Sequence, residues 1–318
     1  MVLDYSEIFA RNYGVFSPEE QERIRRTRIL IVGDSGSGES LAVLLARCGF
    51  ERFSLYGAGV YVPSDMNRQL CCFSATVGAR KIEKIKEAVL GVNPRAEVEA
   101  HCSLPDEADI DEAVDRADIV IPAVDDLSYS ILIFRSARRQ AKPAVLCLPS
   151  GSMAWVSVFT RETPTIEDVF GVPELDYQGL RTVTRTREYR CAQYNFITSG
   201  DWRVDWFWDY FLDKRPLALL CAVEWLAAGL AAQETVKLAS KKWRPVEAPA
   251  CWYIRKTGVS RSHFSLFIKY HRKLGWIIFG RGAGRRLHKL THLFWNSVFG
   301  ILRSRQESRE KKRQLPRV

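Results

Sequence analysis

The sequence lacks the residue patterns that mark zinc-binding and exported proteins. Its eight cysteines include no C-x-x-C pair, and no histidine stands at ligand spacing from them, so no structural zinc site is expected. The first fourteen residues carry early acids and no apolar run, which excludes a secretory signal there. The expected class is therefore a reduced, cytoplasmic protein.

Long apolar runs are also missing. The longest one, residues 217–232, is short and is interrupted by Glu224. This length and the internal acid favour a buried helix over a membrane-spanning helix.

Excess positive charge is confined to the end of the chain. The formal net charge is +10, and residues 262–318 alone hold 14 Lys or Arg against two acids, Glu307 and Glu310, a net of +12. The remaining body is therefore nearly neutral. The charge describes the partners of the tail and says little about the chemistry of the core, and nucleic acid is not the expected partner.

The first sixty residues predict a strand, a turn, a helix and a second strand. Ser17 and Pro18 have the chemistry of an N-cap and a first helical position, so residues 17–26 are expected to be helical. Residues 27–33 form a β-branched run that ends at glycine, a helical pattern then closes at Gly49, and residues 52–57 form a second apolar run. This order is a βαβ unit, which requires a parallel sheet.

The same alternation continues to residue 149. Helical patterns cover residues 81–90, 110–115 and 128–140, and strand patterns cover 98–101, 117–126 and 143–149. The predicted fold class is α/β, a doubly wound, mostly parallel Rossmann-like sheet with its ligand crevice at the carboxyl ends of the strands. We expect a helical arm at 1–26, a nucleotide-binding domain at 27–258 and a basic tail at 259–318.

The turn after the first strand is a candidate phosphate-binding loop. It reads G-D-S-G-S-G, and its candidate nucleotide-binding residues are Gly33, Ser35, Gly36 and Gly38. Glycines there allow main-chain amides at a helix start to approach phosphates, although a purely structural turn has the same sequence. Asp34 and Glu39 weigh against phosphate because carboxylates compete for the same positive helix end. We expect part of this anion site to be satisfied internally.

The second strand has no acid at its end. Dinucleotide folds place a carboxylate there to accept the ribose hydroxyls, whereas this strand ends Leu55-Tyr56-Gly57-Ala58-Gly59. An ordinary nicotinamide dehydrogenase is therefore disfavoured.

Four short motifs follow at informative intervals. N-R-Q at 67–69, G-A-R-K at 78–81, N-P at 93–94 and V-D-D at 124–126 resemble, in order and spacing, the ThiF/MoeB/HesA superfamily. That superfamily activates ubiquitin-like proteins and adenylates related carboxylates. The resemblance runs from about Tyr5 to Leu238, and the N-terminal R-N-Y-G-V-F-S-P-E-E and the later T-I-E-D-V-F resemble a bacterial ThiF-like subgroup.

The resemblance implies roles for residues of these motifs. Arg68 and Lys81 would neutralise the triphosphate of ATP, and Asn67 and Gln69 would supply neutral hydrogen bonds beside it. Asp125 would hold a Mg²⁺ ion that bridges phosphate oxygens. Attack of a carboxylate on the α-phosphorus needs charge neutralisation and positioning more than covalent help, which such a set supplies.

A homodimer is also implied, in which Arg11 of the N-terminal arm reaches the phosphates bound by the partner subunit.

Simpler explanations exist for the other residues. Arg68 is then a surface cation, Lys81 the solvated start of a helix, and Asp125 an N-cap for the helix beginning near Ser128.

The sequence departs from the family pattern on the ribose side. Gly57, Gly59 and Pro122 stand where the family has acids. Losing a charged acceptor to ribose costs about 1.5 to 3 kcal/mol, or about ten- to a hundred-fold in affinity.

Cys191 is a weak candidate for a thioester-forming residue, so transfer to a thiol is unsupported.

The second half of the chain is less informative. Residues 156–175 resemble the post-core segment of the subgroup, and residues 222–238 resemble the family's final core helix. The aromatic-rich stretch 194–211 predicts either a packing surface or a lid over a substrate.

The tail carries a helical pattern of its own. Its apolar positions recur at three- and four-residue steps: Leu287, Leu290, Phe294, Val298 and Ile301. A basic amphipathic helix in residues 285–318 suits peripheral contact with an anionic membrane or the groove of a partner, and packing on its own body is the alternative.

Two functions of different class are therefore expected. The first is an ATP- and Mg²⁺-dependent adenylyltransferase that activates a carboxylate, such as the C-terminus of a small ubiquitin-like or sulfur-carrier protein or of a peptide. The second is a catalytically weakened ThiF-like protein that binds a partner or peptide on the same fold. The first is the favoured function, and the missing acids and the acidic loop are the signature of the second.

Overall fold

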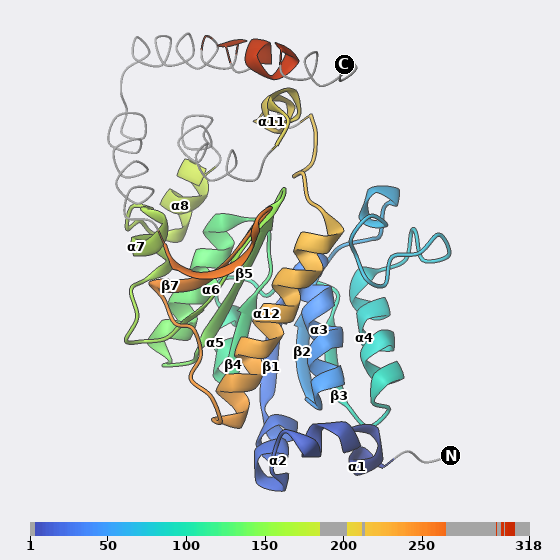
Figure 1. Cartoon of the computed structure of the whole chain (residues 1–318). Coiled ribbons are helices and arrows are strands. Elements are labelled where there is room, and N and C mark those ends of the chain that lie inside the picture. The colour runs from blue at the N-terminus through green and yellow to red at the C-terminus, as the bar shows by residue number, and fades with distance from the viewer. Residues whose placement is uncertain are drawn as a thin grey trace.

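The computed structural model describes residues 4–184, 202–211, 214–264, 297, 300–301 and 303–308. Its centre is an eight-stranded sheet of order β3-β2-β1-β4-β5-β6-β7-β8 (Figure 1). The strands are β1 Arg28–Val32, β2 Arg52–Tyr56, β3 Glu97–His101, β4 Ile119–Pro122, β5 Ala144–Ser150, β6 Met153–Phe159, β7 Ala250–Arg255 and β8 Gly258–His263. The strands from β3 to β5 pair in parallel and those from β5 to β8 antiparallel. The predicted doubly wound, mostly parallel α/β fold is confirmed.

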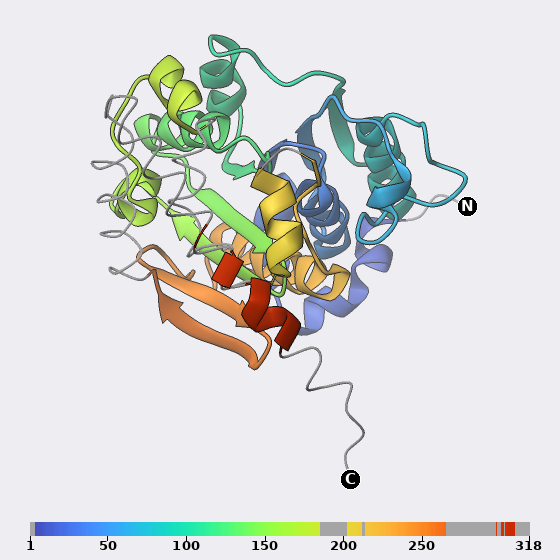
Figure 2. The ribbon, with the colours of Figure 1, turned by 90° about the horizontal axis from the view of Figure 1, so that it is seen from above.

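Helices cover both faces of this sheet (Figures 1 and 2). Those of the main body are α3 Gly36–Cys48, α4 Lys81–Val92, α5 Asp109–Asp115, α6 Leu127–Arg139, α7 Ile166–Phe170, α8 Tyr177–Thr184, α11 Val204–Phe211 and α12 Cys221–Ser240. A short 3-10 turn, η2 Pro63–Asp65, lies in the crossover between β2 and α4.

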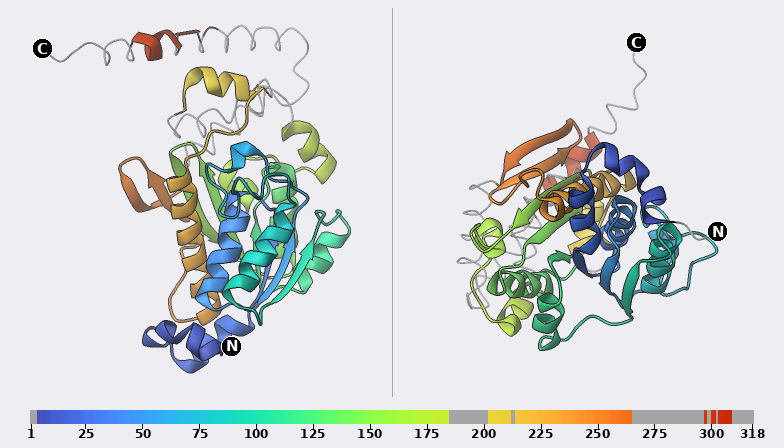
Figure 3. Two further views of the ribbon diagram at one scale, coloured as in Figure 1. Left: turned by 90° about the vertical axis from the view of Figure 1, so that its right-hand side faces the viewer. Right: turned by 90° about the horizontal axis from the view of Figure 1, so that it is seen from below.

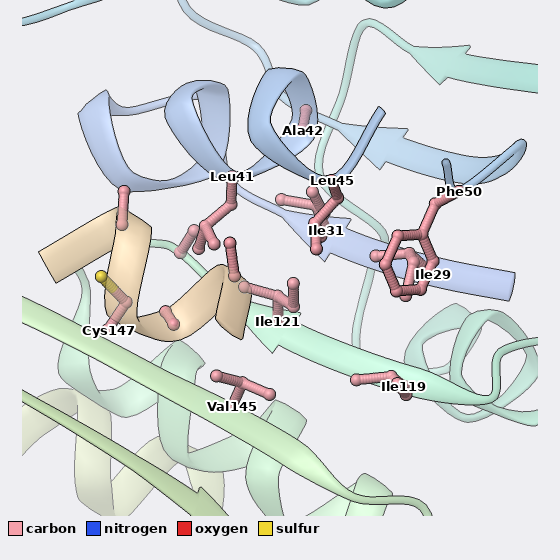
Figure 4. Close-up of a cluster of buried hydrophobic side chains, with 14 of the residues drawn as sticks. Ile29, Ile31, Leu41, Ala42, Leu45, Phe50, Ile119, Ile121, Val145 and Cys147 are labelled. Carbon is pink, nitrogen blue, oxygen red and sulfur yellow. The ribbon is translucent and has the colours of Figure 1, made fainter. Parts of the chain in front are cut away.

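Alternation along β1 builds the two hydrophobic layers. Ile29 and Ile31 belong to the cluster that includes α3, α4 and α12, whereas Leu30 and Val32 belong to the cluster that includes α5 and α6. Successive side chains of a strand point to opposite faces, so a strand buried on both sides reads as one continuous apolar run. Figure 4 shows Ile31 beside Leu45, and Ile29 beside Phe50, in the first layer.

The predicted helix ends around β1 are confirmed. Ser17 caps α2 (Pro18–Arg26) by accepting a hydrogen bond from the Glu20 amide at 3.2 Å, and the Glu20 carboxylate accepts from the Ser17 amide at 2.9 Å. Helix α3 ends at Gly49, whose φ of 101° is a left-handed conformation that favours glycine.

The N-terminal arm consists of α1 (Tyr5–Ile8), η1 (Ala10–Gly14) and α2. The Tyr5 hydroxyl donates to the Gly49 carbonyl at 2.6 Å, and Arg23 donates to the Ser240 carbonyl at 2.7 Å. The arm is therefore attached where α3 and α12 end, at the amino ends of the strands. Figure 3 shows it at the end of the molecule opposite α11.

The antiparallel edge was not predicted in detail. Strand β6 is buried along its whole length and overlaps the start of residues 156–175, which were expected to be a post-core segment. Strand β8 reads G-V-S-R-S-H, is mostly exposed and carries no strand signal, yet it pairs with β7 and crosses the expected boundary at residue 258.

The apolar run at 217–232 leads into the buried helix α12, as expected. Within the described ranges, no helix is long and apolar enough to cross a membrane. Cys191 and most of the basic tail, including Leu287 and Phe294, lie outside the described residues.

Candidate active site

A crevice opens at the carboxyl end of the sheet, where β1 leads to α3 on one face and neighbouring β4 leads to α6 on the other. Such a switch point is the usual ligand site of doubly wound folds. The crevice encloses about 460 Å³ and is lined by Gly33, Asp34, Ser35, Ala58, Gly59, Leu104, Ala123, Val124, Asp125, Asp126, Tyr129, Tyr177 and Arg181. Its size suits a small-molecule ligand.

The glycine loop packs tightly on the end of β4. Gly33 has a φ of +117°, and a Cβ added to it would lie 2.1 Å from the Ala123 carbonyl oxygen. A Cβ on Gly38 would lie equally close, at 2.1 Å, to the Gly33 carbonyl oxygen. The Ser35 hydroxyl donates to the Ala123 carbonyl at 2.9 Å. Glycine is thus required at both ends of the loop for packing, whatever the loop binds.

A buried carboxyl group from α12 lies against the first turn of α3. Glu224 is 1% exposed and accepts a hydrogen bond from the Ser37 hydroxyl at 2.7 Å. A Cβ on Gly36 would lie 2.9 Å from its carboxyl carbon. Burial raises the pKa of Glu224 to about 7, although the Ser37 hydrogen bond and Arg68 oppose the shift. The Glu224 side chain therefore occupies space beside the first turn of α3.

The acid that contacts this helix start is not Glu39. Glu39 is buried deeper in the molecule, where it accepts a hydrogen bond from the Tyr61 hydroxyl at 2.6 Å and another from the Cys71 amide. The expectation that Glu39 competes with phosphate is therefore wrong. Glu224 lies beside the first turn of α3 instead. It stands almost two hundred positions later in the chain, so no local pattern can indicate this contact.

Asp34 turns away from the helix start and toward the end of β2. Its Oδ2 accepts a hydrogen bond from the Gly59 amide at 2.7 Å. A Cβ added to Gly57 would lie 2.4 Å from the same oxygen. Gly57 and Gly59, which follow β2, therefore make room for the carboxylate of Asp34.

The two expected phosphate-binding cations lie together around one buried acid. Lys81 Nζ is 2.9 Å from Asp65 Oδ2, and Arg68 Nη2 is 3.4 Å from Asp65 Oδ1. Their side chains are only 12% and 23% exposed, respectively. Neither residue is a solvated surface cation, so the simpler explanations for both are wrong.

Asn67 and Gln69 support this cluster, and like Arg68 and Lys81 they are not among the residues that line the crevice. The Asn67 side-chain oxygen accepts a hydrogen bond from Arg68 Nη1 at 2.9 Å. Buried Gln69 donates from Nε2 to Asp65 Oδ1 at 3.0 Å. Both residues hold the charged groups in position.

Asp125 follows β4 and lines the crevice. It does not cap α6, because Asp126 is the N-cap and accepts hydrogen bonds from the amides of Ser128 at 2.9 Å and Tyr129 at 3.2 Å. The surrounding protein desolvates Asp125 and raises its pKa above the usual range, while the nearby positive charges oppose that shift. A crevice-facing carboxylate near two cations fits Mg²⁺, which binds one or two carboxylates together with phosphates and water. The described residues contain no group of three or more His, Cys, Asp or Glu placed to hold a metal alone.

Arg11 lies far from the crevice of its own chain. It is exposed on η1, and its neighbour Asn12 donates to the carbonyl of Cys48 at the far end of α3. The thirteen residues of α3 separate the two ends by about 20 Å.

Four residues of this region were not predicted from the sequence. Tyr177 and Arg181 line the crevice from α8, and they belong to a stretch with no recognisable motif. Asp65 stands two residues before N-R-Q, where its acidic character was the only available signal. Glu224 was noted only as a charge within an apolar run.

A second hollow, of about 820 Å³, lies at the amino end of the sheet between α2 and the end of α12. Its walls carry charges of both signs, including Glu22, Arg26 and Asp118. We place the active site in the crevice instead, because the carboxyl ends of parallel strands converge there with the glycine loop.

Comparison with known proteins gives one family. The model of the ThiF family matches residues 9–271. The vegetative HesA protein of Trichormus variabilis is 28% identical over 166 residues, which are 52% of this chain and 63% of that protein. A molybdopterin-synthase adenylyltransferase of Haemophilus influenzae is 28% identical over 151 residues, 47% of this chain and 62% of that protein. The chain thus matches less than two thirds of the length of these relatives.

Solved structures share the fold at low sequence identity. The Microcin C7 biosynthetic enzyme MccB in complex with N-formylated MccA has a TM-score of 0.63 at 19% identity, over 83% of this chain and 75% of that one. Escherichia coli MccB with ATP has a TM-score of 0.61 at 18% identity, over 82% of this chain and 73% of that one.

Proposed function

This chain belongs to the ThiF family, and from that premise we propose that it is an ATP-dependent adenylyltransferase that activates a carboxylate. The observation that carries the proposal is the cluster beside the crevice. Two cations, Arg68 and Lys81, lie together near Asp125, whose carboxylate is of the kind that binds metal ions. Asp125 lines the crevice at the switch point of the doubly wound sheet.

The proposed reaction uses these groups for electrostatics. A carboxylate oxygen of the substrate attacks the α-phosphorus of ATP, and the bond to the leaving β-phosphate breaks, which yields an acyl adenylate and pyrophosphate. Arg68 and Lys81 neutralise charge on the phosphates. Asp125 would hold Mg²⁺, which supplies further charge neutralisation when it is bound.

For the substrate, we propose the C-terminal carboxylate of a small carrier protein or peptide. The name of the molybdopterin-synthase adenylyltransferase and the MccB complex with N-formylated MccA support this class. Tyr177 and Arg181, which line the crevice from α8, would be the first groups that such a chain end meets.

We also propose that the chain works as a homodimer. Arg11 lies at the end of α3 that faces away from its own crevice, so it would reach a triphosphate only in a second copy. Exposed apolar residues near the crossover after β2 and the start of α12, among them Met66, Phe73 and Trp225, support such an interface.

One observation favours the second function, a weakened relative that binds a partner or peptide. Asp65 already pairs with both Arg68 and Lys81, so an incoming triphosphate must compete with a buried carboxylate for them. If this pairing is permanent, the fold retains the crevice without nucleotide chemistry.

Calorimetry with Mg²⁺ and ATP separates the two functions without knowledge of the carboxylate substrate. For the enzyme, we expect Lys81→Ala or Asp125→Ala to weaken binding by about ten- to a hundred-fold, the value of a charged contact. Arg80→Ala is the matched control, because Arg80 adjoins Lys81 in sequence but is exposed. Absent or millimolar binding that Asp125→Ala leaves unchanged would overturn the enzymatic function.

A further inference from the structure

The ribose side of the crevice contains a carboxylate in an unusual place. The family pattern expects acids at the end of β2, and this chain has Gly57 and Gly59 there. The structure brings Asp34, from the glycine loop after β1, to the same position. The absence of acids at the end of β2 and the presence of Asp34 after the neighbouring strand β1 are therefore linked.

The fit between Asp34 and the two glycines is specific. A Cβ on Gly57 would lie within 2.5 Å of the Cβ, Cγ and Oδ2 atoms of Asp34, and a Cβ on Gly59 would lie 2.9 Å from Oδ1. Real Cβ atoms do not approach other atoms so closely. Asp34 and any side chain at position 57 therefore exclude each other, and only one of them can supply a carboxylate at this point.

The carboxylate of Asp34 retains capacity to accept hydrogen bonds. Among the described residues, its bonding partner is the Gly59 amide, which donates to Oδ2 at 2.7 Å. No ion pair with Asp34 occurs in the described part of the chain, and the residue lines the crevice. A carboxylate that lines a ligand cavity and forms no ion pair with the described residues is suited to accept hydrogen bonds from neutral hydroxyl groups.

We propose that Asp34 is the acceptor for the ribose hydroxyls of the nucleotide, so that the acid has moved from the end of β2 into the glycine loop. The inference rests on the proposed function, because it concerns the nucleotide of that same crevice. Asp34 then determines the preference of the protein for a ribose that carries hydroxyl groups. This role of Asp34 also explains why the loop tolerates an acid beside the start of α3, since the Asp34 carboxylate points toward β2.

The test compares the affinities of ATP and 2′,3′-dideoxy-ATP, each with Mg²⁺, by calorimetry. The wild type should prefer ATP by about ten- to a hundred-fold, because charged hydrogen bonds to the hydroxyls are lost with the dideoxy nucleotide. Asp34→Ala should bind both nucleotides equally and about as weakly as the wild type binds the dideoxy form. Asp34→Asn keeps the shape and one acceptor, and should retain a smaller preference.

A relocation experiment separates a ribose contact from a general effect on folding. Gly57→Asp alone should lower the melting temperature, because the new side chain overlaps Asp34. The double variant Asp34→Gly/Gly57→Asp removes the overlap and returns an acid to β2, so both the melting temperature and the preference for ATP should recover. This nonadditivity is the signature of two side chains that compete for one place.

Three results would contradict the inference. Equal, measurable affinity of the wild type for ATP and dideoxy-ATP would overturn it and leave the proposed function standing. A gain in affinity for both nucleotides in Asp34→Ala would show that Asp34 repels phosphate instead. Failure of the wild type to bind either nucleotide would overturn the proposed function, and the role of Asp34 with it.

Discussion

Asp65 lies beside both cations that the proposed chemistry uses. Besides Lys81 and Arg68, it accepts hydrogen bonds from Gln69 Nε2 at 3.0 Å and from the Val62 amide at 3.1 Å. Such a carboxylate is fully satisfied, and it offsets charge that a triphosphate would otherwise meet. In the proposed function, the affinity for ATP therefore depends on the competition between Asp65 and the phosphates for two side chains.

Replacing Asp65 with asparagine removes this competitor while keeping its shape. We expect Asp65→Asn to raise the affinity for Mg²⁺ and ATP by about tenfold, since roughly 1.4 kcal/mol of opposing interaction is released. The melting temperature should fall, because two partly buried cations lose their counter-ion. Calorimetry below the melting temperature measures the first effect.

Glu87→Gln is the matched control, because Glu87 pairs with Lys84 on an exposed face of α4. It should change neither quantity appreciably. A folded Asp65→Asn protein with unchanged or weaker affinity for ATP would contradict the competition.

At the scale of elements, helix α12 packs against helix α3. This contact contains the hydrogen bond from Ser37 to Glu224, buried where the glycine loop becomes a helix. Burial raises the pKa of Glu224 from its ordinary value of 4.5 to about 7. The folded protein therefore holds a proton on this group at pH values where the unfolded chain has released it.

The stability contributed by this proton is full below about pH 4.5 and is lost as the pH rises through 7. We expect the free energy of unfolding of the wild type to fall between pH 5 and pH 8 relative to Glu224→Gln, by at most about 3 kcal/mol. Denaturant unfolding of both proteins at the two pH values measures the difference. Because Glu39 and Asp125 also have raised pKa values and act in the same direction, only the difference between the proteins is diagnostic. Parallel profiles would contradict the assignment to Glu224.

Elements with local signals could be predicted from the sequence, and those without them could not. Ser17 and Gly49 mark the ends of α2 and α3 through cap chemistry, which depends on neighbouring residues only. Strand β8 is mostly exposed and polar, so nothing in its residues distinguishes it from a loop before β7 is present to pair with it.

The same distinction applies to the crevice. Arg68, Lys81 and Asp125 could be chosen because they stand in motifs, whereas the positions of Asp34 and Glu224 depend on contacts between distant segments. Asp34 meets the end of β2 some 25 residues further along, and Glu224 meets Ser37 across 187 residues. Sequence analysis therefore identified the missing acids but not the residue that takes their place.

At the scale of the whole molecule, the crevice lies at the carboxyl end of the sheet. The N-terminal arm lies at the opposite end of the molecule from α11 (Figures 1 and 3). Arg23 and Tyr5 join the arm to the ends of α12 and α3, so it is an integral part of the body. This arrangement keeps Arg11 away from its own crevice. The single chain therefore contains the cation pair, the metal-binding type of carboxylate and Asp34, and the proposed contribution from Arg11 requires a second copy.

The most direct test of the account is a crystal structure of the protein with Mg²⁺ and α,β-methylene ATP, in which the bond under attack cannot break. We predict that the ribose hydroxyls donate to Asp34, that the phosphates contact Lys81 and Arg68 in place of Asp65, and that Asp125 ligates Mg²⁺. A nucleotide bound elsewhere, or a crevice in which Asp65 still holds both cations beside a bound triphosphate, would contradict it.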